Sequence, residues 1–99
     1  MPELPEVETT RRGLAPRVTG ATVAALQVYD ARLRWPVPEH LPARVAGRRV
    51  EALERRGKYL LFRFAEGTMI VHLGMTGSLT VHEAPPPRRP HDHLDLVLA

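Results

Sequence analysis

Residues Lys58–Leu73, KYLLFRFAEGTMIVHL, carry the clearest structural pattern in the sequence. Within Lys58–Phe64, leucine and phenylalanine side chains recur at every second position, which places them on one face of a β-strand. The Glu66-Gly67 pair predicts a tight turn, and Met69–Leu73 predicts a second, short strand. We therefore expect an antiparallel hairpin in the middle of the chain.

The N-terminal segment predicts one short helix over residues 5–15. Pro5 suits the first turn of a helix, and Glu6 and Glu8 favour the positive end of the helix dipole. Gly13 and Pro16 are expected to end the helix. The chain terminus and two carboxylates are then expected to share a small volume.

The rest of the chain is mostly strand-like and punctuated by turns. Period-two alternation with short connections argues for an antiparallel sandwich or flattened barrel rather than for β-α-β units. The apolar alternation runs up to the last residue, where an unpaired edge would be unfavourable, so we expect residues 1–99 to be one incomplete domain. The expected segments are strands at Ala21–Tyr29, Arg49–Glu54, Ser78–His82 and His93–Ala99, a polar loop at Asp30–Pro38, and one or two helical turns at His40–Ala46.

Composition narrows the class of protein. The 99 residues carry a net charge of +3 with a pI near 10.2, and 13 of the 14 basic residues are arginine. Arginine suits phosphate contacts, although a surface on which arginine has replaced lysine would look the same. There is no cysteine, no apolar run of about 20 residues and no basic-then-apolar leader, so we expect a soluble intracellular protein.

The first chemically notable residue is Pro2. After removal of Met1 its nitrogen would be a secondary amine, and α-amino groups titrate around pH 8, so a useful fraction is neutral near pH 7. Such an amine could attack a sugar C1′ and form an iminium. If Met1 is retained, the nitrogen is an amide and is not nucleophilic.

Three side chains could assist that amine. Glu3 and Glu6 are spaced by one helical turn and could act as general acid or base, or could simply be acids favoured by the helix dipole. Lys58, the single lysine, follows Gly57 and could hold a phosphate or deliver a proton; the alternative is a solvated cation at a strand edge.

Two further residues could contact a nucleic acid. Met75 lies between Gly74 and Gly77 and is either core filler or an apolar wedge on a loop, as used by enzymes that extrude a base. His91 could contact a phosphate. His91 and His93 are too few to make a metal site, so no metal site is expected.

Taken together and in order, these motifs make the chain similar to the formamidopyrimidine-DNA glycosylase family. The resemblance covers essentially all 99 residues. Its motifs are Pro2-Glu3-Leu4-Pro5-Glu6-Val7-Glu8-Thr9, Arg11-Arg12-Gly13, Gly20-Ala21-Thr22, Arg32-Leu33-Arg34-Trp35-Pro36, Arg55-Arg56-Gly57-Lys58-Tyr59-Leu60-Leu61, His72-Leu73-Gly74-Met75-Thr76-Gly77-Ser78-Leu79 and His91-Asp92-His93-Leu94-Asp95.

The resemblance implies a role for each site residue. Pro2 would be the Schiff-base nucleophile, Glu3 the general acid at the deoxyribose and Glu6 a supporting carboxylate. Lys58 would donate a proton during β-elimination and contact phosphate. The residues implied in DNA binding are Met75, which would fill the space left by the everted nucleotide, His91, Arg34 and Arg56.

The resemblance also implies a fold and a wider organisation. The fold would be mainly β with flanking helices, an antiparallel β-sandwich truncated before its last strands. Family members continue with a helix–two-turn–helix domain and a four-cysteine zinc finger, so the complete protein would carry a structural zinc that this chain lacks. The implied partner is damaged double-stranded DNA, bound by a monomer in the bacterial cytoplasm, with no membrane association.

Three hypotheses for function remain open. The first is excision of oxidised purines, such as 8-oxoguanine and formamidopyrimidines, followed by β,δ-elimination at the abasic site. The second is an inactive fragment or a non-catalytic module that binds damaged DNA. The third, a basic β-domain with another role, requires all seven motifs to be coincidental.

Overall fold

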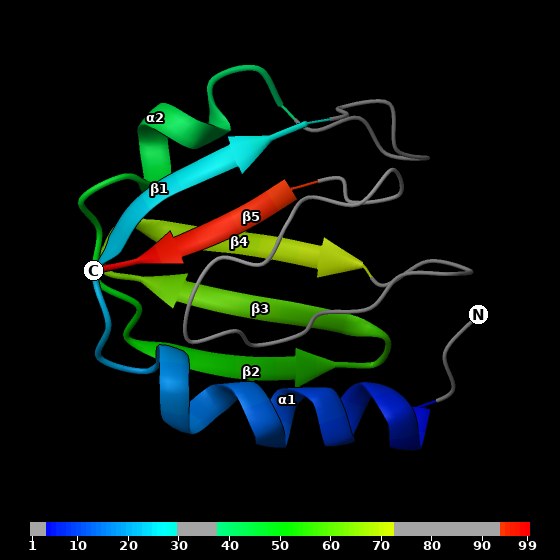
Figure 1. The fold of residues 1–99 in the computed structure, drawn as a ribbon. Coiled ribbons are helices and arrows are strands. Elements are labelled where there is room, and N and C mark those ends of the chain that lie inside the picture. The colour runs from blue at the N-terminus through cyan, green and yellow to red at the C-terminus, as the bar shows by residue number, and fades with distance from the viewer. Residues whose placement is uncertain (1–3, 30–37, 73–93) are drawn as a thin grey trace. The chain divides into compact units, whose positions relative to one another are not determined.

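A computed structural model describes residues 4–29, 38–72 and 94–99 (Figure 1). The chain divides into two compact units, which are described separately. The first unit comprises Met1–Ala21 and Arg49–Val81, and the second comprises Thr22–Arg48 and His82–Ala99.

The first unit is built on a three-stranded antiparallel sheet in the order β2-β3-β4. Strands β2 (Ala52–Arg56) and β3 (Tyr59–Phe64) are joined by a two-residue turn, as are β3 and β4 (Gly67–His72). Gly67 has φ +141°, a conformation essentially restricted to glycine, and this explains why a glycine begins β4. The hairpin expected from the alternating pattern is confirmed.

One face of this sheet forms the core of the first unit. Side chains that lie opposite one another across the three strands are buried together, and α1 packs mainly against β2 (Figure 1). Leu61, which lies on the opposite face from Leu60, is also buried. Among the described residues, the buried apolar side chains of the first unit are Val7, Leu14, Val18, Val50, Leu53, Leu60, Leu61, Phe62 and Met69.

Helix α1 spans Leu4–Val18, three residues beyond the predicted end. The prediction that Gly13 and Pro16 terminate it is wrong. Proline removes one backbone hydrogen bond, but Leu14 and Val18 are both buried, and four-residue spacing puts them on one helical face. Burying each side chain contributes about 1.5–3 kcal/mol, which offsets the loss of one hydrogen bond.

Strand β2 also differs from its prediction. It was expected at 49–54 and lies at Ala52–Arg56. The backbone of Val50 pairs instead with the segment that follows α1, donating to the Ala21 oxygen at 2.8 Å and accepting from the Gly20 nitrogen at 2.7 Å. Lys58, expected to open a strand, lies in the turn between β2 and β3.

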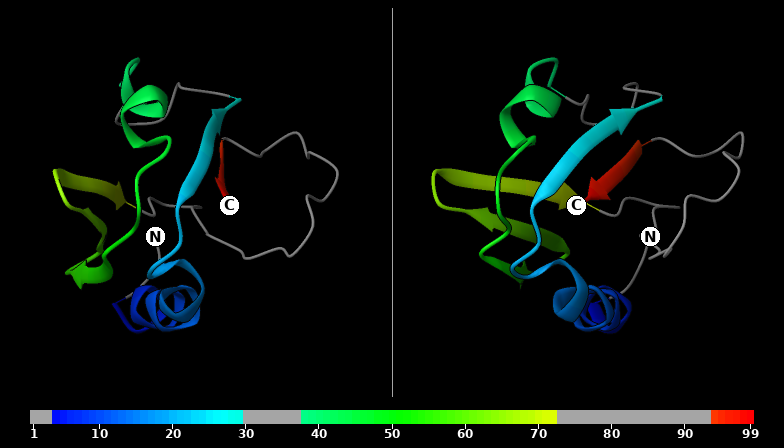
Figure 2. Two further views of the ribbon diagram at one scale, coloured as in Figure 1. Left: turned by 90° about the vertical axis from the view of Figure 1, so that its left-hand side faces the viewer. Right: turned by 60° about the vertical axis from the view of Figure 1, so that its left-hand side comes forward.

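The second unit contains a two-stranded antiparallel sheet of β1 (Val23–Val28) and β5 (Leu94–Leu98). Helix α2 (Leu41–Val45) lies beside β1 and buries Val45 (Figure 2). Both strands match predicted segments, as does the short helix. The predicted strand at 78–82 and loop at 30–38 lie outside the described residues, except for Pro38.

These elements confirm the expected fold class, mainly β with antiparallel sheets and flanking helices. Among the described residues, neither helix has the length and apolar character needed to cross a membrane.

We predict that Leu60→Ala lowers the free energy of unfolding by about 2–5 kcal/mol, because Leu60 is fully buried at the centre of the sheet. The matched control is Ile70→Ala on β4, because Ile70 is 62% exposed. The expected loss in the free energy of unfolding for this control is about 0.5 kcal/mol or less. Urea unfolding followed by circular dichroism measures both. Equal losses would contradict this placement of the core.

Candidate active site at the start of the first helix

Three of the eight predicted site residues lie in described parts of the chain, and all three belong to the first unit. Glu6 is on α1, Arg56 ends β2, and Lys58 is in the turn between β2 and β3. The other five predicted site residues lie outside the described residues: Pro2, Glu3, Arg34, Met75 and His91.

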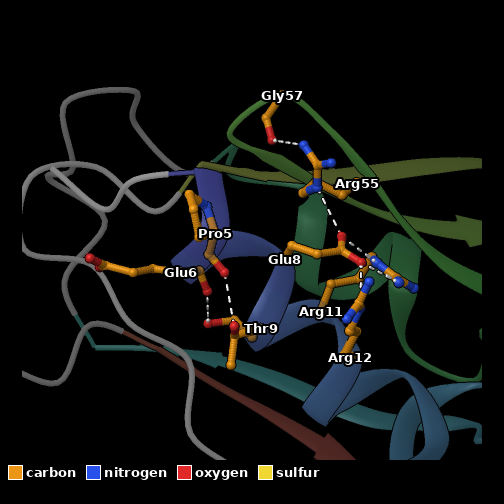
Figure 3. Close-up of polar contacts among 9 residues, drawn as sticks. Pro5, Glu6, Glu8, Thr9, Arg11, Arg12, Arg55 and Gly57 are labelled. Atoms are coloured by element: carbon orange, nitrogen blue, oxygen red, sulfur yellow. Dashed lines mark hydrogen bonds and ion pairs between the residues drawn. The ribbon is translucent and has the colours of Figure 1, made fainter.

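Glu6 occupies the first turn of α1, where its charge favours the positive end of the helix dipole. Its side chain is exposed. Figure 3 shows Glu6 and Glu8 leaving the helix in opposite directions, as expected for residues two apart. The Glu6 side chain therefore points away from the contacts that Glu8 makes.

Glu8 is the centre of the polar network in this region (Figure 3). One carboxylate oxygen accepts hydrogen bonds from Arg11 Nε and Arg55 Nε, both at 2.9 Å. The other accepts from an Arg11 terminal nitrogen at 2.7 Å and from Arg12 Nε at 2.9 Å. Two oxygens offer about four lone-pair sites, so this carboxylate is fully used.

The arginines change the acidity of Glu8. Hydrogen bonds from Arg11 first, and then from Arg55, hold the pKa of Glu8 well below its usual range. The same hydrogen bond raises the pKa of Arg11. Glu8 is therefore ionised at any pH at which the protein would work, so it is a fixed negative charge rather than a proton carrier.

Arg55 connects this carboxylate to the turn that contains Lys58. Its Nε donates to Glu8 and one of its terminal nitrogens donates to the carbonyl oxygen of Gly57 at 3.0 Å. Gly57, at φ +59°, is the first of the two turn residues and Lys58 is the second. The first turns of α1 and the β2–β3 turn consequently lie at the same end of the first unit (Figure 1).

Arg56 lies on the other face of the sheet from Arg55. It is exposed and pairs across the strands with Tyr59, whose own partner on β4 is His72. The Tyr59 and His72 rings are stacked at a tilt, with centroids 4.9 Å apart. Arg56, Tyr59 and His72 therefore lie in a row across the three strands, with a cation beside two rings that carry polar atoms. Such a surface is suitable for contacts with phosphate or sugar.

Sequence reasoning did not identify Glu8 and Arg55 as site residues. Glu8 had been interpreted as an acid favoured by the helix dipole. Its spacing of three and four residues from Arg11 and Arg12 does predict pairing along a helix. The contact with Arg55 joins residues 47 positions apart, and nothing in a single sequence indicates it.

Across residues 4–29, 38–72 and 94–99, no three histidine, aspartate or glutamate side chains gather in a way that could hold a metal ion. The histidine pair at 91 and 93 lies outside those ranges.

We predict that Glu8→Gln destabilises the protein at pH 7 and has less effect at pH 3. Because the folded-state pKa of Glu8 is lowered, its contribution is complete above the unfolded value of roughly 4.3 and is lost as the pH falls below it. Urea unfolding at both pH values measures the difference from the unaltered protein. An exposed control, Glu39→Gln, should show little difference at either pH, and an undiminished effect of Glu8→Gln at pH 3 would argue against the network.

Comparison with known proteins extends over the whole chain. The formamidopyrimidine-DNA glycosylase N-terminal domain model matches residues 1–99. Formamidopyrimidine-DNA glycosylase of Stutzerimonas stutzeri (strain A1501) is 57% identical over 98 residues, covering 99% of this chain and 36% of the relative. The protein of the same name from Geobacter sulfurreducens is 58% identical over 98 residues with the same coverage. The chain thus spans just over a third of the length of these curated relatives.

Solved structures agree with the sequence relatives. Formamidopyrimidine-DNA glycosylase of Lactococcus lactis, non-covalently bound to DNA containing an AP site, superposes with a TM-score of 0.84 and 37% identity over 99% of this chain and 38% of that one. The same enzyme with DNA containing FAPY-dG gives a TM-score of 0.82 at 37% identity, over 98% of this chain and 37% of that one. The chain belongs to the formamidopyrimidine-DNA glycosylase family and corresponds to that family's N-terminal domain.

Proposed function

We propose that the protein carrying this chain acts in base-excision repair of DNA. It removes oxidised purines, such as 8-oxoguanine and formamidopyrimidines, and then cleaves the strand at the abasic site. Family membership supports this proposal, as do the Lactococcus lactis relatives whose structures contain AP-site and FAPY-dG DNA.

The proposed chemistry begins at the amine of Pro2. Its nitrogen attacks C1′ of the damaged nucleotide, the bond from C1′ to the base breaks, and the base leaves with a proton. Glu3 protonates the ring oxygen as the sugar opens, which leaves an iminium between Pro2 and C1′. The iminium accepts the electron pair released when the C2′ proton is removed, and the C3′–O bond then breaks. A second elimination breaks the C5′–O bond.

The contact between Arg55 and Glu8 is the observation that best supports this arrangement. It ties the start of α1, which immediately follows Pro2 and Glu3, to the turn that carries Lys58. Lys58 then serves as proton donor during elimination and as a phosphate contact, and Glu6 supports the amine. Such groups must lie within hydrogen-bond reach of the atoms they serve, and a fixed spacing between helix and turn favours this.

DNA binding is assigned to four residues. Arg56 and Arg34 contact phosphates, His91 contacts the strand near the lesion, and Met75 fills the space left by the everted nucleotide. Of these, Arg56 is the described one, and its exposure on the sheet surface supports the assignment.

We expect borohydride to trap the protein covalently on duplex DNA containing 8-oxoguanine, and Pro2→Gly to lower the adduct yield strongly, because a primary amine then replaces the secondary amine that forms an iminium directly. Gel electrophoresis measures the adduct, and intact-mass measurement establishes whether Met1 has been removed. An adduct of undiminished yield in Pro2→Gly would reject the mechanism.

The same experiment separates the alternative function. A non-catalytic DNA-binding module would give no adduct and a DNA affinity that falls steeply with salt. An inactive fragment would give neither adduct nor specific binding. Retention of Met1 together with normal DNA binding would favour the module over the enzyme.

We also predict different effects at the two cations that flank Gly57. Lys58→Met should slow strand cleavage by about 10²-fold, because it removes a proton donor. Arg56→Met removes the same charge, and should instead weaken DNA binding and reduce the salt slope of affinity by about one, with the cleavage rate at saturating DNA within about twofold of normal. Single-turnover cleavage and salt titrations measure both variants. If both slow cleavage equally, Lys58 acts through charge alone.

A further inference from the structure

Two arginines bind the Glu8 carboxylate at the same distance but from different elements of the fold. Arg12 Nε and Arg55 Nε both lie 2.9 Å from a Glu8 oxygen. Arg12 is four residues away on the same helix, and its side chain is 74% exposed. Arg55 comes from β2, and its side chain is 31% exposed. One bond stays within α1, while the other joins α1 to the sheet.

The position of Arg55 on the sheet gives its bond a structural consequence. Arg55 lies opposite Leu60 in β3, on the face that carries the buried core side chains. A guanidinium that is partly withdrawn from water beside apolar groups needs partners, and the Glu8 carboxylate and the Gly57 carbonyl supply them. The planar guanidinium directs its donors to both at once, which fixes the distance between helix and turn.

We propose that Glu8 and Arg55 are positioning residues for the reaction. They hold the N-terminal part of α1, which the terminal amine precedes in sequence, at a set distance from the turn carrying Lys58. This inference rests on the proposed function. A positioning role requires no contact of either residue with the DNA or with the reacting atoms. The effect on rate can still be large, because a displacement of about 1 Å between reacting groups can cost about 10²-fold.

The core keeps the helix in place without this link. Val7 is fully buried, and Leu14 and Val18 are buried further along α1. Loss of the Arg55 contact is therefore expected to cause a small displacement at the start of the helix, limited by the burial of Val7, rather than to detach the helix. A positioning role then predicts a slower chemical step with little change in DNA affinity or in folding.

The test compares Arg55→Met with Arg12→Met in the protein that carries this chain. Each substitution removes one cation and one 2.9 Å hydrogen bond to Glu8, but Arg55→Met alone breaks the link to the sheet. The single-turnover rate of borohydride-trapped adduct formation should fall about 10- to 100-fold in Arg55→Met, with KM within about twofold of the unaltered protein. Arg12→Met should stay within about twofold in both quantities.

Two further variants complete the design. Arg55→Lys keeps the charge but loses the two-donor geometry, so it should recover only part of the rate. Glu8→Gln should slow the reaction at least as much as Arg55→Met does, since it also weakens the bonds from Arg11 and Arg12. The double variant should be no slower than the slower single one, because both changes disrupt the same Glu8–Arg55 contact. If Arg55→Met unfolds at the assay temperature, Glu8→Gln, measured against Arg12→Met, provides the test.

The outcomes separate this inference from the proposed function. Equal rates for Arg55→Met and Arg12→Met, or a loss confined to KM, would overturn the positioning role and leave the enzymatic assignment standing. Additive losses in the double variant would also overturn it. Absence of an adduct from the unaltered protein would overturn the proposed function and this inference with it.

Discussion

The Glu8 carboxylate accepts four hydrogen bonds from three arginines, two on its own helix and one on strand β2. An ionised carboxylate has about four lone-pair sites, so this group has no capacity left for a substrate or a proton. Its value to the protein is geometric. Through Arg55 it relates the start of α1 to the β2–β3 turn, and the candidate active site is the region between these two elements.

Hydrophobic burial and ion pairing contribute differently to the packing of α1 against the sheet. The side chains of α1 that enter the core each contribute about 1.5–3 kcal/mol, and they decide that the helix lies on the sheet. Partly exposed ion pairs contribute far less, with a median of about 0–1 kcal/mol. Burial has no direction, however, whereas a forked hydrogen bond has one. The apolar contacts therefore hold the helix on the sheet, and the bond from Arg55 to Glu8 joins the N-terminal part of the helix to strand β2.

The sequence predicted local features well and long-range ones poorly. The β3–β4 hairpin and the segments of β1 and β5 followed from alternation and turn residues. The end of α1 did not, because burial of Val18 outweighs the effect of Pro16. At the candidate site, Glu6 and Lys58 were predicted from spacing and residue type, and they remain predictions. The pairing of Glu8 with Arg12 follows from their four-residue spacing on a helix. The pairing of Glu8 with Arg55 depends on how the helix packs against the sheet, which the periodicity of the sequence does not predict.

The adjacent residues Arg55 and Arg56 show how a long-range contact separates the roles of two neighbouring arginines. The abundance of arginine was interpreted as suited to phosphate contacts, but consecutive residues on a strand point to opposite faces, so Arg55 and Arg56 need not act alike. Arg55 is occupied by Glu8 and Gly57, so Arg56 is the one whose exposed guanidinium remains on the outer face. One arginine of the pair is thus bound within the protein, and its neighbour is exposed on the opposite face of the sheet. A strand leading into a two-residue turn makes both roles possible within three residues of Lys58, without either cation competing for the other's partners.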